Sequence, residues 1–405
     1  MSFQQGLSGL NAAARNLDVI GNNVANANTV GAKMARAEFA DIYASSLSGG
    51  GNNAIGIGVQ VATIAQQFTQ GDISTTNNPL DVAINGAGFF PLSDNGAPVY
   101  TRNGQFKVDA DGYIVSTQGL KLQGFMADSN GQVGGVTTDL RLNVDGVAPQ
   151  ATSDLALRLN VDARATVPTL AFDATDTATY SGVTTTKVFS PQGVEHTLAM
   201  YFRKAADNQW EVHAALDGTM FASNPVSTLD FDAATGRLPS TFLPFTQTVD
   251  VPAAEGGPID IEIDLTGLTQ FGSPFAVTEM TQNGYAPGDL AGFSIAPDGM
   301  LMARYSNGRT LTQGQLTLVN FRNPQGLAPA GSNNWTATSV SGEALTPQAP
   351  GTGNLGVLQS GALEQSNVDL TGELVNMITA QRIYQANAQT IKAQDQLLQT
   401  ITNLR

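Results

Sequence analysis

The two ends of this chain share a periodicity that the residues between them lack. Residues 2–28 and 366–405 carry apolar or small side chains at steps of three and four, which is the pattern of a narrow heptad seam along a helix. The stretch between them is rich in Gly, Thr and Asn and has the turn signals of β structure. A chain that keeps two coiled-coil-like segments for its ends is expected to pair them, and then to pair with copies of itself.

The expected seam runs along both terminal helices. Its members are Phe3, Leu7, Leu10, Leu17 and Val24 in the first helix, and Leu370, Leu374, Met377, Ile378, Tyr384, Ile391, Leu398 and Ile401 in the second. Ser366 and Asp369 form a start signal for the second helix. The alternative is two ordinary helices packed on a domain core, but helices this long commonly find partners outside the monomer.

Composition excludes several classes of function. The 405 residues are 41% apolar, enough for a core, and the net charge of −15 disfavours nucleic acids and anionic membranes. No apolar run approaches the roughly 18 residues of a membrane span, and the N-terminus lacks the pattern of a cleaved secretory signal. The absence of cysteine excludes disulfides, thiol catalysis and cysteine-ligated zinc.

The middle of the chain is expected to be mostly antiparallel β structure, because Asn-Gly and Asp-Gly pairs recur between alternating segments. The fold class is therefore multidomain and mainly β, with sandwich- or barrel-like domains strung outward from an inner helical coiled-coil domain. The expected division is 1–28 with 366–405 as the helical domain, 29–74 as an extended connection, 75–145 with 285–365 as a middle β domain, and 146–284 as an inserted outer β domain. Residues 45–53, rich in Ser, Gly and Asn, are expected to be a flexible link.

The sequence offers no reaction centre. Nucleotide-binding, hydrolase and metalloprotease motifs are absent from it, so we expect no enzyme activity, no cofactor and no metal. His196 and His213 lie near Glu195 and Glu211, but two surface histidines on strands are the favoured interpretation. Asp260, Glu262 and Asp264 alternate with apolar residues and are expected to form a solvated strand face.

Four sequence blocks together resemble the bacterial flagellar rod and hook protein family. They are NNVANANTVGAK (22–33), LDVAINGAGFF (80–90), YTRNGQF (100–106) and GALEQSNVDL (361–370). Ala32 departs slightly from the family, which often has an aromatic residue there. The middle segments NGY (283–285), PGDL (287–290) and FRNPQGL (321–327) look like those of hook proteins. A distal-rod-type protein is the near alternative, and a secreted adhesin or binding module is the distant one.

The resemblance implies a structural subunit that polymerises through its terminal helices into a curved hollow tube, acting as a universal joint and an export channel. The implied location is the extracellular hook of the bacterial flagellum. The implied partners are further copies, the distal rod protein, the hook cap, the hook–filament junction protein, the hook-length ruler and the flagellar type III export apparatus. The other face of the C-terminal helix carries the expected channel lining, Gln385, Gln389, Gln396, Gln399 and Asn403. Phe39 and Tyr43 are similar to an export motif of the family; two ordinary buried aromatic residues are the alternative.

Overall fold

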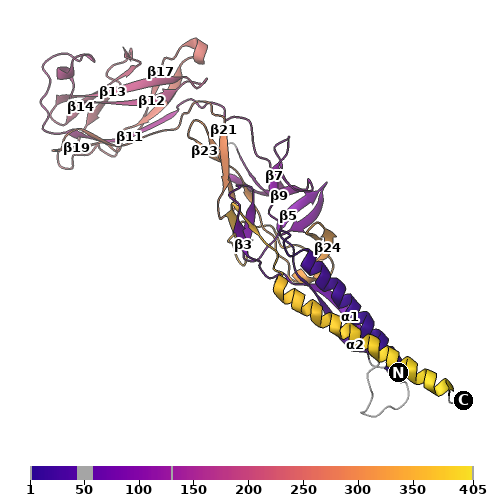
Figure 1. The fold of residues 1–405 in the computed structure, drawn as a ribbon. Coiled ribbons are helices and arrows are strands. Elements are labelled where there is room, and N and C mark those ends of the chain that lie inside the picture. The colour runs from indigo at the N-terminus through magenta and orange to yellow at the C-terminus, as the bar shows by residue number, and fades with distance from the viewer. Residues whose placement is uncertain (1, 43–57, 129–130, 404–405) are drawn as a thin grey trace. The chain divides into compact units, whose positions relative to one another are not determined.

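The computed structural model describes residues 2–42, 58–128 and 131–403. The chain divides into two compact units. Unit 1 comprises residues 1–144, 292–304 and 310–405, and unit 2 comprises residues 145–291 and 305–309. The expected fold class, mainly β with the terminal helices packed together, is confirmed (Figure 1). The finer division into four domains stays a prediction.

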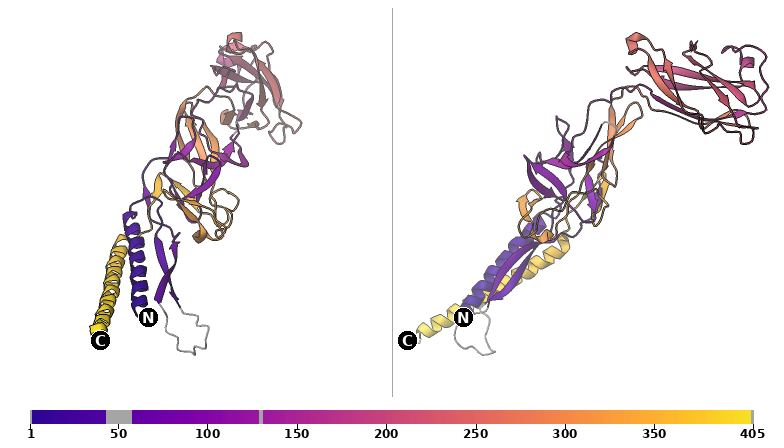
Figure 2. Two further views of the ribbon diagram at one scale, coloured as in Figure 1. Left: turned by 90° about the vertical axis from the view of Figure 1, so that its right-hand side faces the viewer. Right: turned by 180° about the vertical axis from the view of Figure 1, so that it is seen from behind.

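The two terminal helices, α1 (Ser2–Ala25) and α2 (Leu370–Asn403), pack side by side in unit 1 (Figures 1 and 2). They run antiparallel, because Gly6 faces Ile391 while Asn23 near the end of α1 bonds to Glu373 near the start of α2. A Cβ added to Gly6 would lie 3.2 Å from Ile391 Cγ1, so glycine permits this close approach. Since α2 has 34 residues and α1 has 24, the last turns of α2 extend beyond the start of α1.

The start of α2 is fixed by its own sequence. The Asp369 side chain accepts a hydrogen bond from the Thr371 N–H at 3.0 Å, which caps the first turn. Ser366, the other half of the expected start signal, accepts instead from the Val368 N–H, before the helix begins.

A β-hairpin follows α1 and packs against it. Strands β1 (Ala35–Ile42) and β2 (Gly58–Gln66) pair antiparallel, with a register shift between Glu38 and Phe39. The range 29–74, expected as an extended connection with little periodicity, thus contains regular structure. The irregularity in the pairing interrupts the alternation by which a strand is recognised in sequence. The expected flexible link, residues 45–53, lies outside the described residues.

The rest of unit 1 is a β body. Its strands are β3 (Ile73–Thr75), β4 (Val82–Asn85), β5 (Phe90–Asp94), β6 (Ala97–Thr101), β7 (Phe106–Val108), β8 (Ile114–Ser116), β9 (Lys121–Ala127), β10 (Val133–Asp139), β21 (Leu290–Ile295), β22 (Met300–Tyr305), β23 (Thr310–Leu316), β24 (Ala328–Gly331), β25 (Asn334–Thr336), β26 (Val357–Ser360) and β27 (Ala362–Glu364). The main path is β21-β22-β23-β9-β5-β6-β25-β24, whereas the late strands β26 and β27 pair with the early strands β4 and β3. The C-terminal segment is therefore bound to the N-terminal one before α2 begins.

Unit 2 is a β-sandwich. One sheet contains β11 (Asp154–Asp162), β17 (Phe245–Val249), β18 (Ile259–Asp264), β19 (Thr269–Phe271) and β20 (Ala276–Gln282); the other contains β12 (Gly182–Phe189), β13 (Glu195–Ala206), β14 (Gln209–Leu216), β15 (Thr219–Met220) and β16 (Ser227–Asp230). Alternate residues of β11 and β18 are buried in one core with Trp210 and Phe202. The strand face bearing Asp260 and Glu262 is exposed, as expected.

The pairing in unit 2 is mostly antiparallel, as expected, with two parallel exceptions. β11 runs parallel to β18 and to β19, although antiparallel to β20. The second sheet lies in the chain between β11 and β18, and a connection of that length lets a strand return in the same direction.

The two histidines lie on strands β13 and β14, but the expectation of surface side chains is wrong: His196 is 7% exposed and His213 is 6% exposed. The His196 ring bridges two carboxylates, with Nδ1 2.7 Å from Asp217 and Nε2 2.7 Å from Glu255. His213 stacks on Phe172 at 3.9 Å. Among the described residues, no group of three or more His, Cys, Asp and Glu side chains is placed to hold a metal ion, and no helix has the length and apolarity to span a membrane.

Candidate assembly surface and the junction behind it

The helix pair presents two rows of exposed apolar side chains. On α1, Phe3 is 47% exposed and Leu7 is 44% exposed. On α2, the row contains Leu370, Leu374 and Ile378, which are 44%, 45% and 51% exposed. Members of each row are four residues apart, so they lie on one face of their helix.

Other residues of the two helices are buried, either against the partner helix or, on α1, against the hairpin. Among those of α1 that are buried are Gly6, Ala12, Ala13, Val19, Ile20 and Asn23; those of α2 include Glu373 and Ala380. Of the expected seam, Leu10, Leu17, Val24, Met377 and Ile391 are partly buried, and Tyr384 is 37% exposed. The side chains of Leu398 and Ile401 lie outside the described part. The seam therefore combines positions facing the partner helix, such as Ile391, with positions facing outward, such as Leu374.

The two exposed rows lie at opposite ends of the helix pair. Because the helices are antiparallel, the first turns of α1 lie beside the later turns of α2, near Asn387 and Ile391. The α2 row from Leu370 to Ile378 instead lies beside the end of α1, where Asn23 meets Glu373.

The expected channel residues lie on the surface of α2. Gln385, Gln389, Gln396 and Gln399 are exposed, and the side chain of Asn403 lies outside the described part. These residues were expected on a face separate from the seam. The spacing of Gln385, Gln389, Gln396 and Asn403 instead continues the line of Leu374 and Ile378 in steps of four and seven, so one face of α2 is apolar in its first turns and amide-rich later.

Phe39 of the expected export motif lies on β1 and is 43% exposed, so the alternative of a buried residue does not hold for it. Tyr43 lies outside the described residues.

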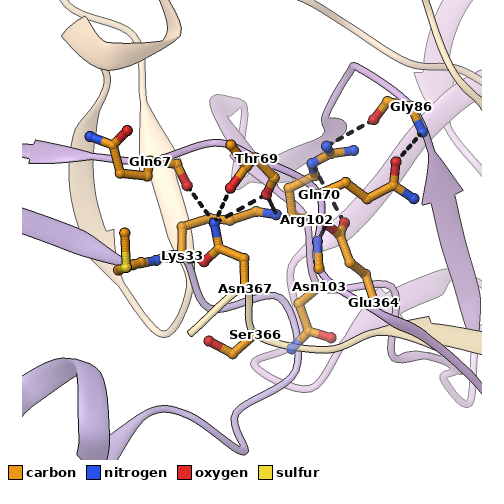
Figure 3. Close-up of polar contacts among 12 residues, drawn as sticks. Lys33, Gln67, Thr69, Gln70, Gly86, Arg102, Asn103, Glu364, Ser366 and Asn367 are labelled. Carbon is orange, nitrogen blue, oxygen red and sulfur yellow. Dashed lines mark hydrogen bonds and ion pairs between the residues drawn. The ribbon is translucent and has the colours of Figure 1, made fainter. Parts of the chain in front are cut away.

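A buried ion cluster joins the helix pair to the β body (Figure 3). Lys33 Nζ lies 2.6 Å from Glu364 Oε1, and Arg102 Nε lies 3.6 Å from Glu364 Oε2. The Lys33 and Glu364 side chains are fully buried, and that of Arg102 is 3% exposed. One carboxylate thus balances two buried cations. Burial lowers the pKa of Lys33; Glu364 opposes this shift and Arg102 adds to it.

Backbone groups complete the cluster. Glu364 Oε1 also accepts the Gly71 N–H at 3.0 Å, and Lys33 donates to the Thr69 carbonyl at 2.8 Å. The Arg102 Nη2 group donates to the Gly86 carbonyl at 2.9 Å. The cluster therefore binds the segment after α1, the segment after β2 and the last strand before α2.

Two asparagines extend this junction. Asn367 accepts the Met34 N–H at 2.7 Å and donates to the carbonyls of Gln67 and Thr69 (Figure 3). Asn23 makes both backbone hydrogen bonds of Ala35, at 2.8 and 2.9 Å, and donates to Glu373 at 3.1 Å. None of these residues was expected to be a site residue from the sequence. A signal was nevertheless present, because Asn23, Lys33, Arg102, Glu364 and Asn367 all lie inside the blocks that carry the family resemblance.

Four families or domains of flagellar proteins match successive parts of the chain. The flagella basal body rod protein family matches residues 3–33, and the D1 domain of flagellar hook protein FlgE/F/G matches 83–171. The D2 domain of flagellar basal body protein FlaE matches 160–285, and the C-terminal region of flagellar basal body rod protein FlgEFG matches 359–404.

Full-length relatives show whether the chain is similar to hook proteins or to rod proteins. Flagellar hook protein FlgE of Escherichia coli is 43% identical over 416 residues, with 100% of both chains covered. FlgE of Salmonella typhimurium is 42% identical over 417 residues with the same coverage, and FlgE of Treponema pallidum is 32% identical, covering 100% of this chain and 99% of its own. The chain belongs to the flagellar hook protein family. This membership makes it a structural component of the flagellum and not an enzyme.

A solved structure shows a related fold. Flagellar hook protein FlgE2 of Helicobacter pylori aligns with a TM-score of 0.56 at 14% identity, covering 72% of this chain and 100% of that one. The full-length identity to hook proteins, rather than this likeness of fold, separates the chain from rod proteins and from adhesins.

Proposed function

We propose that the chain polymerises head to tail through the two exposed rows of its helix pair, forming the hollow, curved tube of the flagellar hook. The observation that carries this proposal is the pair of apolar rows at opposite ends of α1 and α2. Fully burying one such side chain contributes about 1.5–3 kcal/mol of favourable free energy. A side chain that is half-exposed in the single chain would therefore contribute roughly half of this free energy when a neighbouring copy covers it.

Membership of the hook protein family, and not the placement of the rows alone, favours an open polymer, because a two-fold dimer that pairs each row with the other row of its partner would also cover both rows. If Phe3 and Leu7 of one copy contact Leu374 and Ile378 of the next, each contact leaves one unused row at either end of the assembly. Contacts between two different surfaces continue into rings or helical filaments. The tube would then carry torque from the rod to the filament and give passage to exported chains.

A mixing experiment tests this pairing. Phe3→Gln/Leu7→Gln copies lack the first row, Leu374→Gln/Ile378→Gln copies lack the second, and Thr390→Gln on an exposed position of α2 is the control. In sedimentation and negative-stain microscopy, neither row variant should elongate alone, and their mixture should stop at short oligomers while the control forms tubes. Tubes from either row variant at the wild-type concentration would contradict the proposal.

The later turns of α2 are proposed to line the channel with Gln385, Gln389, Gln396, Gln399 and Asn403. An uncharged amide surface would let unfolded chains pass without adhering. The same face of α2 would then contact neighbouring copies in its first turns, at Leu374 and Ile378, and line the channel in its later turns. Gln389→Leu should slow export of filament protein past the hook, and unchanged export would count against this role.

The Phe39 and Tyr43 pair is proposed to act as an export signal. The 43% exposure of Phe39 leaves it accessible on β1. The Phe39→Ala/Tyr43→Ala chain should be synthesised normally but retained in the cell, whereas normal secretion would exclude the signal. Proposed partners are the distal rod protein, the hook cap, the hook–filament junction protein, the hook-length ruler and the type III export apparatus.

A further inference from the structure

Three consecutive residues of the N-terminal segment are each fastened by a polar contact of their own. Lys33 binds the Glu364 carboxylate, the Met34 N–H donates to Asn367, and the Ala35 N–H and carbonyl both bind Asn23. We call these contacts the three rungs. The rungs follow directly on one another where the chain passes from α1 into β1.

The two asparagines use nearly all of their bonding capacity in this role. An amide offers one carbonyl acceptor and two N–H donors. Asn23 divides them between Ala35 and Glu373, which joins α1, β1 and α2 at one side chain. Asn367 divides them between Met34 on one side and Gln67 and Thr69 on the other. Each side chain is thus held from more than one direction.

Directionality distinguishes this junction from an apolar contact. Apolar surfaces slide over one another at little cost, whereas a hydrogen bond weakens steeply once its angle departs from linear. Asn23 is 4% exposed, so a displaced partner of Asn23 would find little water to replace it, whereas Asn367 is partly exposed and is held mainly by the number of its bonds. Of the three rungs, only Lys33–Glu364 reaches a strand of the β body, whereas the two asparagines fasten the helix pair to the hairpin and to residues 67–69. Rotation of the helix pair would strain these bonds together.

We propose that Asn23 and Asn367 are positioning residues. They hold the helix pair against the β1–β2 hairpin and against residues 67–69, which lead into the β body of unit 1, and so fix the direction of the helix pair. The junction is then a stiff coupling through which a single chain passes torque. The consequence for torque rests on the proposed function, but the positioning role is a property of the single chain.

The absence of cysteine from the sequence allows a clean measurement on the full-length chain. Thr117→Cys on the β body and Lys392→Cys on α2 place spin labels at two exposed positions. Pulsed electron paramagnetic resonance then gives the distribution of distances between the two spin labels. The comparison is between the labelled parent, the Asn23→Ala/Asn367→Ala variant and Asn78→Ala, a matched change at an exposed loop position.

We expect one narrow distance peak for the parent and for Asn78→Ala, and loss of that peak to a broad distribution in the double variant. A narrow, unshifted peak in the double variant would overturn the inference, and so would a broad distribution in the parent. A role in stability alone would lower the unfolding temperature but leave the peak narrow below it. Circular dichroism and a thermal scan are therefore recorded on each sample.

If the double variant does not fold, the single variants Asn23→Ala and Asn367→Ala carry the test, since each leaves one amide in place. Peaks broader than the parent in both single variants support the inference, and parental peaks in both reject it. Because the labels are read at concentrations where the chain is monomeric, failure of the polymerisation proposal would leave this result intact.

Discussion

Replacing Glu364 with glutamine tests the buried cluster that joins the helix pair to the β body. The substitution keeps the shape of the side chain and removes its charge. Lys33, 2.6 Å away, and Arg102, 3.6 Å away, would then be two buried cations with no carboxylate between them. Removing one partner of a buried ion pair typically costs 3–5 kcal/mol, because the remaining charge stays buried and uncompensated.

The size of the effect follows from this placement. For an m-value of roughly 2 kcal/mol per molar urea, a loss of about 4 kcal/mol lowers the unfolding midpoint by about 2 M. The loss should fall on unit 1, which holds all three charged residues. The chain has two tryptophans, and Trp335 lies in unit 1 whereas Trp210 lies in unit 2. A Trp210→Phe background therefore makes tryptophan fluorescence report on unit 1.

The matched control is Glu38→Gln in the same unit. Glu38 pairs with Arg36 at 2.9 Å, but its side chain is 42% exposed. Exposed ion pairs contribute about 0–1 kcal/mol, so this midpoint should move little. The reasoning is refuted if Glu364→Gln unfolds at the same urea concentration as Glu38→Gln.

Two further predictions concern other parts of the chain. His196 can donate to both Asp217 and Glu255 when protonated: burial alone would lower its pKa, but the hydrogen bonds and charges of these two carboxylates outweigh burial and raise it. A raised folded-state pKa means that this stability is fully present below the unfolded value near 6.5 and is lost as pH rises through the folded value. In a Trp335→Phe background, thermal scans read at Trp210 should show that loss in unit 2 of the parent and not of His196→Gln. The same dependence of unfolding temperature on pH in both chains would contradict the bridge. In α1, Gly9→Val should cost about 1–3 kcal/mol, because a Cβ there meets Asn387 at 2.9 Å. Gly21→Ala, with nothing within 4 Å, should be neutral or stabilising by up to about 1 kcal/mol, and equal urea midpoints for the two would refute the close helix approach.

Local pattern was enough to predict several elements. The steps of three and four at each end predicted the helices that the structure places at Ser2–Ala25 and Leu370–Asn403. Asn-Gly and Asp-Gly pairs marked hairpins such as the turn from β5 to β6, where Asn95 and Gly96 both have positive φ. These features depend on periodicity and on the conformational preferences of single residues, which neighbouring sequence is sufficient to express.

The sequence alone determined that this chain has two helical ends around a mainly β middle, and its signature blocks indicated the family. The tertiary structure decided which side of each helix is buried, because Gly6 and Gly9 permit a close approach that a count of large apolar residues does not reveal. It also decided that Lys33 meets Glu364, and Asn23 meets Glu373, across more than 300 residues of chain. Such contacts depend on where the intervening strands return, and no local pattern records that.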